Sequence, residues 1–237
     1  MANLHPLTQF MRQSTDFFIR QGFEIADTPE IETEYYNFDS LNVPATHSSR
    51  DTQDTFWLED GRVLRTHTSS AQVRVMEKRK PPVRIIVPGR CFRNERTEPG
   101  HEATFFQLDG FVIDHDIRIN HLLTITEDFA KNIFGPSVKT RIRPHFYPFV
   151  EPGFDIDINC LICQGKGCSV CKNSGWLEVM PCGMIHPTVL KNMKIDPEQW
   201  SGFAFGFGID RLMMLYFGVD DIRLSYKNDL RFLKQFK

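Results

Sequence analysis

Apolar residues recur at helical spacing in two long segments of the chain. In residues 5–20 they return every three or four positions, with Pro6 suited to a first helical turn and Gly22 to a helix end. Residues 117–134 show the same spacing. The pattern predicts an amphipathic opening helix and a second helix that covers a core.

Other segments have the pattern of strands. Residues 202–218 (GFAFGFGIDRLMMLYFG) read as a glycine-punctuated strand that turns into a helix. Residues 35–58 are too polar and irregular for a regular element, so we expect a long ordered loop that forms a functional wall. Shorter strands are predicted in residues 23–31, 83–87, 138–143 and 176–180.

Residues 88–111 form a predicted hairpin that is unusually polar. Period-2 alternation places Phe105, Gln107, Asp109 and Phe111 on one face of its second strand. The hairpin carries five charged or amide side chains in all, namely Arg90, Arg93, Glu95, Gln107 and Asp109. Such groups cost free energy inside apolar strands unless they are paired, so we expect a ligand with both charge and hydrogen-bonding groups. A solvated face is the alternative.

Two predicted helix starts favour anions. Residues 64–75 read as a strand end followed by a helix, because Ser69 and Gln72 form an S-x-x-Q capping box. Arg211 falls in the first turn of the helix within residues 202–218, where its charge opposes the helix dipole. An anionic ligand would resolve that conflict.

Composition predicts one domain with a substantial core. The chain has 237 residues, 41% of them apolar, and no Pro/Gly/Ser-rich linker divides it. The formal charge of −2 requires any nucleic-acid contact to come from a local patch such as Lys78, Arg79, Lys80 and Arg84, for which a solvated helix end is the alternative. No apolar run approaches membrane-span length and no signal peptide is visible, so we expect a cytosolic protein.

Four of the six cysteines lie in two Cys-x-x-Cys pairs within residues 160–176. Four thiolates so spaced can close a tetrahedral zinc site, which would have a structural role because no coordination position stays open. A redox pair, free thiols or a knuckle that binds nucleic acid or protein are the alternatives. Cys91 and Cys182 read as buried small hydrophobes. The predicted ligands are Cys160, Cys163, Cys168 and Cys171.

Several of these segments together resemble one family. The hairpin GRCFRNE…HEATFFQLDG resembles motif 2 of the class II aminoacyl-tRNA synthetases, and specifically the phenylalanyl-tRNA synthetase alpha subunits. The same family is matched by four further segments, namely YNFDSLNVP, DTFWL, HTS and GWLEVMPCGMIHPTVLKN. Residues 202–218 resemble class II motif 3. The resemblance implies an α+β fold, a mainly antiparallel sheet flanked by helices, as one catalytic domain over residues 1–237 with residues 160–176 inserted. It starts at His5, so we expect a catalytic domain without the family's N-terminal coiled-coil arm.

The resemblance also implies roles for individual residues. Arg93 would contact the α-phosphate of ATP and the substrate carboxylate, and Arg211 the terminal phosphate. Phe105 would stack on adenine, Glu95 would accept from its amine, and His101 would contact phosphate. The implied amino-acid pocket, which phenylalanine would occupy, consists of Trp57, His67, Ser69, Gln107, Asp109, Tyr147, Phe149, Val150 and Ala204.

Some of these assignments have structural alternatives or depart from the family pattern. Trp57 could be a core residue, and His67 a satisfied structural histidine. Tyr147 stands where the family usually has Phe, and Asp109 and Asp210 each replace the commoner Glu. At position 106 the chain has Phe where the family often has His.

The resemblance further implies cofactors and partners. These are ATP as substrate, Mg²⁺, tRNA(Phe), and a beta subunit in a heterotetramer of two alpha and two beta chains. Two other functions stay open. The chain could be a paralogue that activates an amino acid for an acceptor other than tRNA, or a non-catalytic zinc-knuckle binding module on a relict synthetase fold.

Overall fold

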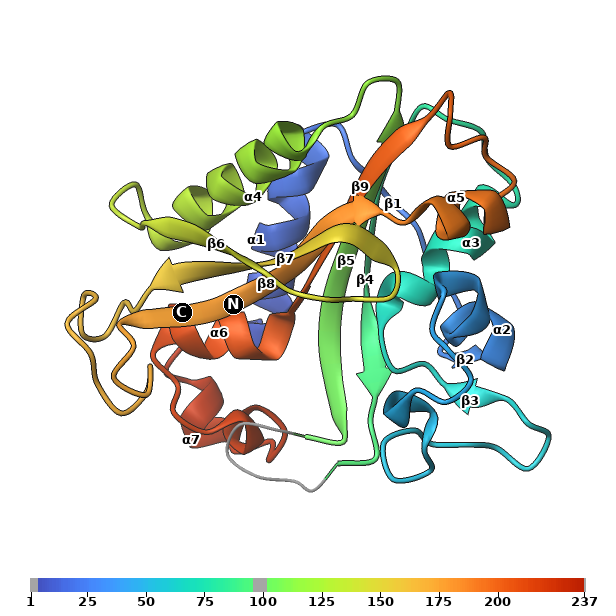
Figure 1. The fold of residues 1–237 in the computed structure, drawn as a ribbon. Coiled ribbons are helices and arrows are strands. Elements are labelled where there is room, and N and C mark those ends of the chain that lie inside the picture. Colours follow the sequence, from blue (N-terminus) through green and yellow to red (C-terminus); the bar gives the residue numbers. More distant parts are fainter. Residues whose placement is uncertain (1–3, 96–101, 237) are drawn as a thin grey trace.

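A computed structural model describes residues 4–95 and 102–236, and a seven-stranded sheet forms its centre (Figure 1). The strand order is β1-β4-β5-β9-β8-β7-β6, with every neighbouring pair antiparallel except β1 and β4. The strands are β1 Glu24–Ile25, β4 Val83–Phe92, β5 Thr104–Asp114, β6 Thr140–Pro144, β7 Val150–Asn159, β8 Trp176–Ile185 and β9 Ser201–Gly208. A small second sheet pairs β2 Ile31–Glu32 with β3 Val63–Leu64.

Helices cover both faces of the large sheet. One face carries the long helices α1 and α4 together with α6, and the other carries α3 and α5, with the small sheet beside them (Figure 1). The helices are α1 Pro6–Arg20, α2 Glu34–Asn37, α3 Ala71–Met76, α4 Ile119–Phe134, α5 Pro187–Asn192, α6 Ile209–Phe217 and α7 Leu230–Leu233. Short 3-10 turns span Asp39–Leu41, Ser48–Arg50, Thr68–Ser70 and Ile222–Ser225.

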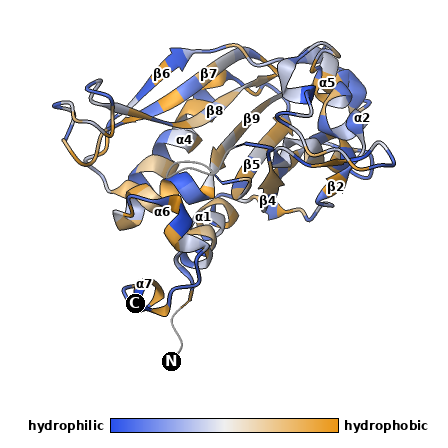
Figure 2. Cartoon of the chain, turned by 90° about the horizontal axis from the view of Figure 1, so that it is seen from below, coloured by the Kyte–Doolittle hydropathy of each residue, from blue (hydrophilic) through white to orange (hydrophobic). Residues whose placement is uncertain are grey.

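The two sheet faces bury two separate hydrophobic clusters. Leu108 and Val112 of β5 pack with α1, α4 and α6, whereas Phe111 packs with α3 and α5 on the opposite side. The predicted alternation of β5 is therefore confirmed. Figure 2 shows hydrophobic residues along the central strands β4 and β5, between the two layers of helices.

Phenylalanine rings fill the cluster beneath α1. Phe18 stacks on Phe129 of α4 at a centroid distance of 5.1 Å and on Phe205 of β9 at 5.0 Å. Phe205 in turn lies over Gly110, where an added Cβ would come within 2.4 Å of the ring. The absent side chain at Gly110 is what lets this ring approach the sheet.

The opening and covering helices are confirmed, but the capping box is wrong. Ser69 lies inside a 3-10 turn that begins after His67, and its hydroxyl donates to Asp109 rather than to a helix amide. Residues 35–58 are largely irregular, as expected, although they include the end of α2 and two 3-10 turns. No helix in the described part of the chain is long and apolar enough to cross a membrane.

Candidate active site

Two adjoining cavities open along the β4–β5 hairpin. The larger has a volume of about 530 Å³ and the smaller about 240 Å³. Both are lined by Arg93, Glu95, Gln107 and Pro181, so they form two parts of one cleft. The polar residues that made the hairpin unusual therefore lie on the floor of a binding site.

Asp109 is the buried acidic group of the larger cavity. Its Oδ2 accepts a hydrogen bond from Ser69 Oγ at 2.5 Å, while its Oδ1 is buried and has no partner among the described residues. Burial raises the pKa of Asp109 to about 6, and the hydrogen bond from Ser69 opposes that shift. A carboxylate with one unsatisfied buried oxygen is suited to a cationic ligand.

Gly206 makes room for this carboxylate. It lies opposite Asp109 in the β5–β9 register, and an added Cβ would come within 2.1 Å of Asp109 Oδ1. At Gly206 the group that approaches is a side chain of the protein itself.

Gln107 lies where the two cavities meet. Its Oε1 is 3.7 Å from the thiol of Cys91, which is fully buried and whose pKa burial raises. Cys91 and Cys182 are both buried, as predicted. The Gln107 side chain is thus placed to hydrogen-bond a ligand that spans both cavities.

His67 lines the larger cavity as a neutral imidazole. Burial, together with the nearby charge of Arg93, lowers the pKa of His67 to about 3. Its Nδ1 is buried and has no partner among the described residues. His67 can therefore offer a hydrogen bond to a ligand but no charge.

Aromatic rings form one wall of the same cavity. Tyr147 stacks between His145, at a centroid distance of 4.6 Å, and Phe149, at 5.7 Å. The Tyr147 hydroxyl donates to Asp155 at 2.7 Å. The predicted pocket residues His67, Ser69, Gln107, Asp109, Tyr147, Phe149, Val150 and Ala204 all line this cavity.

Trp57 is the predicted pocket residue that the structure places elsewhere. It is not among the residues that line the larger cavity. Its indole Nε1 donates to the carbonyl of Arg50 at 3.1 Å, and its ring packs against the hydrophobic cluster that contains Phe38. Trp57 is half-buried at the edge of that cluster, which is closer to the core alternative than to the predicted place in the pocket.

The smaller cavity carries the predicted ATP residues. Arg93 lies over the ring of Phe105, with its Cζ 4.9 Å from the ring centroid, and Arg211 reaches the cavity from the first turn of α6. Within residues 4–95 and 102–236, no ion pair involves either guanidinium. Two guanidinium groups with no acidic partner in the described part of the chain are suited to a phosphate chain. The predicted phosphate contact His101 lies outside the described residues.

Asp210 also lines the smaller cavity, and both of its carboxylate oxygens are hydrogen-bonded. Its Oδ2 accepts from the backbone N–H of Phe106 and its Oδ1 from the Tyr226 hydroxyl, both at 2.5 Å. Burial raises the pKa of Asp210 to about 6, against the effect of these two hydrogen bonds. Asp210, which stands where the family commonly has Glu, therefore connects α6 to β5 through Phe106 and to the C-terminal segment through Tyr226.

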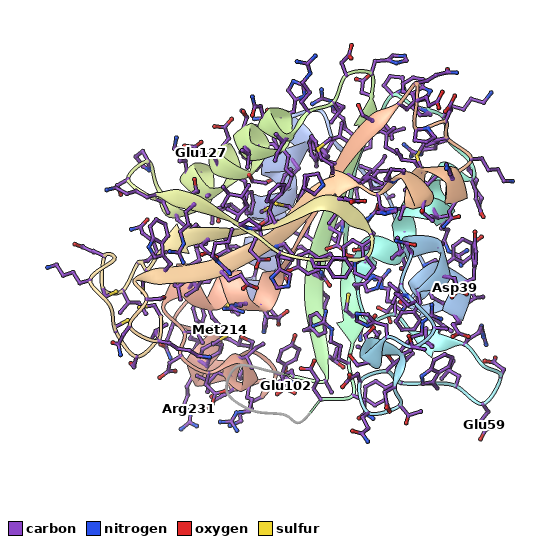
Figure 3. All side chains as sticks on the ribbon, in the orientation of Figure 1. Asp39, Glu59, Glu102, Glu127, Met214 and Arg231 are labelled. Carbon is purple, nitrogen blue, oxygen red and sulfur yellow. The ribbon has the colours of Figure 1, made fainter. Side chains whose placement is uncertain are left out.

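Glu102 and Glu178 also line the smaller cavity. Glu102 lies two residues before the start of β5 (Figure 3). Glu178 belongs to β8. Neither was a predicted site residue. Carboxylate oxygens beside a phosphate site are donors of the kind that Mg²⁺ accepts.

The four clustered cysteines have the geometry of a metal site. Their sulfur atoms all lie within 4.8 Å of one another, and three of the pairs are 3.7 to 3.8 Å apart. Zn–S bonds of about 2.3 Å in a tetrahedron require S···S separations of roughly 3.8 Å. Burial raises the pKa of Cys171, but hydrogen bonds from the backbone N–H groups of Cys168 and Gly175 outweigh it and lower that pKa to about 6. The donor set therefore fits zinc.

Sequence reasoning missed several cavity residues. His145 precedes a predicted pocket residue by two positions, a spacing that could have placed both on one side of the loop. Phe38 and Val43 come from the loop that we expected to form a wall, and they line the larger cavity. Pro181 and Cys182 of β8 lie in a segment that matches the family but were not predicted to line a cavity, because only the sheet order brings β8 beside β9.

Comparisons with known proteins agree with this geometry. The family model "tRNA synthetases class II core domain (F)" matches residues 1–236. The "Phenylalanine--tRNA ligase alpha subunit" of Clostridium perfringens is 52% identical over 232 residues, which cover 98% of this chain and 68% of that protein. The protein of the same name from Alkaliphilus oremlandii is 53% identical over 236 residues, with coverages of 100% and 70%.

A solved structure shares the fold. The pyrrolysyl-tRNA synthetase of Desulfitobacterium hafniense superposes with a TM-score of 0.71 over 98% of this chain and 76% of its own, at 18% sequence identity. At that identity the likeness concerns the fold alone. With the family match over nearly the whole chain and relatives above 50% identity, the chain belongs to the class II tRNA synthetase core family, among the phenylalanine–tRNA ligase alpha subunits.

Proposed function

We propose that the chain activates L-phenylalanine with ATP and transfers the phenylalanyl group to tRNA(Phe). The observation that carries this proposal is the buried Oδ1 of Asp109 in an aromatic cavity, for which the described residues offer no hydrogen-bond partner. A free amino acid with an apolar ring supplies both an ammonium group for that oxygen and a ring for the wall. The adjoining cavity with Arg93 and Arg211 then receives the nucleotide.

The amino acid would lie along β5. Its ammonium group would pair with Asp109, with Gln107 and neutral His67 in hydrogen-bonding positions. Its ring would lie among Phe149, Val150 and Ala204, which line the larger cavity but not the smaller one. This orientation directs the carboxylate toward the junction of the two cavities.

In the first step a carboxylate oxygen of phenylalanine attacks the α-phosphorus of ATP. The bond between the α-phosphorus and the bridging oxygen breaks, and pyrophosphate leaves with the electron pair. Arg93 neutralises charge on the α-phosphate and carboxylate, and Arg211 binds the terminal phosphate, so the rate comes from positioning and charge stabilisation. No side chain acts as nucleophile. In the second step a ribose hydroxyl of tRNA attacks the carbonyl carbon and AMP leaves.

The nucleotide end would also hold magnesium. Glu102 and Glu178 line the smaller cavity, and their carboxylates together with phosphate oxygens suit the octahedral oxygen coordination that Mg²⁺ prefers. Bound there, the ion would supply counter-charge for the leaving pyrophosphate.

We propose a structural zinc ion at the four cysteines. Cys160 and Cys171 are buried in the main hydrophobic cluster, so the metal would tie the insertion to the core between β7 and β8. Freshly purified protein is expected to contain one zinc per chain by atomic absorption. Removal of the zinc by a chelator should lower the melting temperature. Activity should recover when zinc is added back. A zinc content far below one per chain would contradict the site.

The partners proposed are tRNA(Phe) and a beta subunit, in a heterotetramer of two alpha and two beta chains acting in the cytoplasm. They follow from membership among the alpha subunits. Sedimentation of the co-expressed chains tests the stoichiometry, since an equimolar complex of four chains is expected.

Phenylalanine-dependent ATP–pyrophosphate exchange, with and without the beta subunit, tests the proposed activity. Exchange in the reconstituted complex followed by charging of tRNA(Phe) is the expected result. Exchange without charging would favour the paralogue with another acceptor. Zinc binding without any exchange would favour the non-catalytic module and defeat the proposal.

A further inference from the structure

One acidic residue behind the cavity wall has no part in the proposed reaction. Asp155 of β7 is fully buried. Its Oδ1 accepts from the Tyr147 hydroxyl at 2.7 Å, and its Oδ2 lies 3.0 Å from His145 Nδ1 and 3.3 Å from Arg143 Nη2. His145 and Tyr147 both line the larger cavity, so two residues of the wall converge on a single carboxylate.

The backbone of this wall is held by other contacts. Asn42 Nδ2 donates to the Pro148 carbonyl at 2.7 Å, and the His186 amide donates to the Phe149 carbonyl at 3.0 Å. These bonds determine where the loop lies. The direction of the Tyr147 ring depends instead on its stacking neighbours and on the bond from its hydroxyl to Asp155.

The hydroxyl of Tyr147 matters for specificity. An apolar pocket rejects a substrate with an added hydroxyl by only about 10²-fold, and a free polar group in the wall would reduce that rejection by pairing with the hydroxyl. Burial and the hydrogen bond to Asp155 both raise the pKa of Tyr147, so its proton stays in place. With its hydroxyl engaged, Tyr147 offers the substrate only a ring.

We propose that Asp155 is a positioning residue for amino-acid specificity. By holding the Tyr147 hydroxyl, it orients the aromatic stack and withholds that hydroxyl from the substrate. The inference rests on the proposed function, because it concerns discrimination between phenylalanine and tyrosine at the same cavity.

Asp157 provides a matched control. It lies two residues further along β7 on the same face and is also buried, at 1% exposure. It accepts from Arg141 and Arg143, each at 2.7 Å, and neither of these arginines lines the larger cavity. Burial opposes the effect of these two arginines, which nevertheless lower the pKa of Asp157. If Asp155 and Asp157 only stabilised the fold, substitution of either residue would change amino-acid specificity to the same extent.

The test measures pyrophosphate exchange in the complex with the beta subunit, with phenylalanine and with tyrosine. Asp155→Ala should raise KM for phenylalanine about tenfold and reduce the phenylalanine-to-tyrosine ratio of kcat/KM at least tenfold, because the hydroxyl of Tyr147 becomes unpaired. KM for ATP should stay within twofold. Asp157→Ala should leave KM and the ratio within twofold while lowering the melting temperature comparably.

Two further variants separate the hydroxyl from the charge. Asp155→Asn keeps an acceptor and should retain the wild-type ratio. Tyr147→Phe, added to Asp155→Ala, removes the unpaired hydroxyl and should restore most of the ratio. If Asp155→Ala does not fold, Asp155→Leu, which fills the same space, carries the same expectation.

The outcomes distinguish this inference from the proposed function. Equal effects of Asp155→Ala and Asp157→Ala, or no restoration by Tyr147→Phe, would overturn the role of Asp155 while exchange by the wild type stands. Absence of phenylalanine-dependent exchange by the wild-type complex would overturn the proposed function itself and the inference with it.

Discussion

The two ends of the cleft are built from different kinds of side chain. At the amino-acid end the charged group, Asp109, is buried and already holds Ser69, and the wall residue Tyr147 is fixed by Asp155. At the nucleotide end Arg211 is exposed, and no described acidic residue forms an ion pair with Arg93 or Arg211. The amino-acid end is therefore shaped before the ligand arrives, whereas the nucleotide end presents positive charge that no described acidic residue neutralises.

This difference separates specificity from rate. A buried group that is held by neighbours discriminates between ligands, because a wrong ligand leaves it unpaired. An exposed cation stabilises charge that develops during the reaction and contributes little to the fold. Substitutions at the amino-acid end should thus change KM, specificity and stability together, whereas those at the nucleotide end should change the rate alone.

The largest effect is expected at the nucleotide end. Arg211→Ala removes a cation from the terminal phosphate and should lower kcat on the order of 10²- to 10³-fold. The melting temperature should stay within about one degree, because Arg211 is exposed and no described acidic residue pairs with it, so its side chain adds little stability. Exchange kinetics and thermal denaturation measure the two quantities. Arg211→Lys serves as the control that retains charge without the planar fork. A large loss of stability in Arg211→Ala would break the comparison.

The next effect is expected at Asp109. Asp109→Asn removes the partner of the substrate ammonium and should raise KM for phenylalanine on the order of 10²-fold, with KM for ATP unchanged. The free protein should become more stable, because a buried carboxylate with an unsatisfied oxygen is replaced by a neutral amide. Steady-state exchange and urea denaturation test both statements. A decrease in stability would contradict the unsatisfied Oδ1, because it would mean that both carboxylate oxygens of Asp109 are paired before substrate binds.

A smaller effect should follow from pH. The pKa of Asp109 in the folded protein is raised to about 6 from its ordinary value near 4, so its contribution to stability is present below pH 4 and is lost as pH rises through about 6. The pKa of Asp210 is also raised to about 6, so its contribution to stability is lost over the same pH range.

The same shift predicts how phenylalanine binding depends on pH. Since the ionised form pairs with the ammonium group, KM for phenylalanine should rise up to tenfold per pH unit below about 6. The pH dependence of KM and of urea midpoints, compared between wild type and Asp109→Asn, checks both effects. An unchanged pH profile in the variant would assign the titration to another group.

Much of the fold could be predicted from local pattern. The spacing of apolar residues predicted α1 and α4, because a helix that covers a core must repeat its apolar face every 3.6 residues. Alternation on β5 separated Leu108 and Val112 from Phe111 correctly. The two Cys-x-x-Cys pairs predicted a four-sulfur cluster, since ligand spacing within one short loop is itself local.

The resemblance to the family predicted most of the residues that line the site, but not all of their local contacts. The capping box predicted at Ser69 was wrong, because the Ser69 hydroxyl donates to the buried carboxylate of Asp109 instead of capping a helix. Trp57 packs against the hydrophobic cluster that contains Phe38, although its motif implied a place in the pocket.

The sequence by itself determined which elements form, which face of β5 is polar and where four thiols gather, because each depends on residues within one segment. Only the tertiary structure decided that Gly206 leaves space for Asp109 and that Asp155 holds Tyr147. Those contacts depend on the register of β5 with β9 and on how the loop before β7 turns back over that strand. Register and loop closure arise from long-range packing, which no single segment encodes.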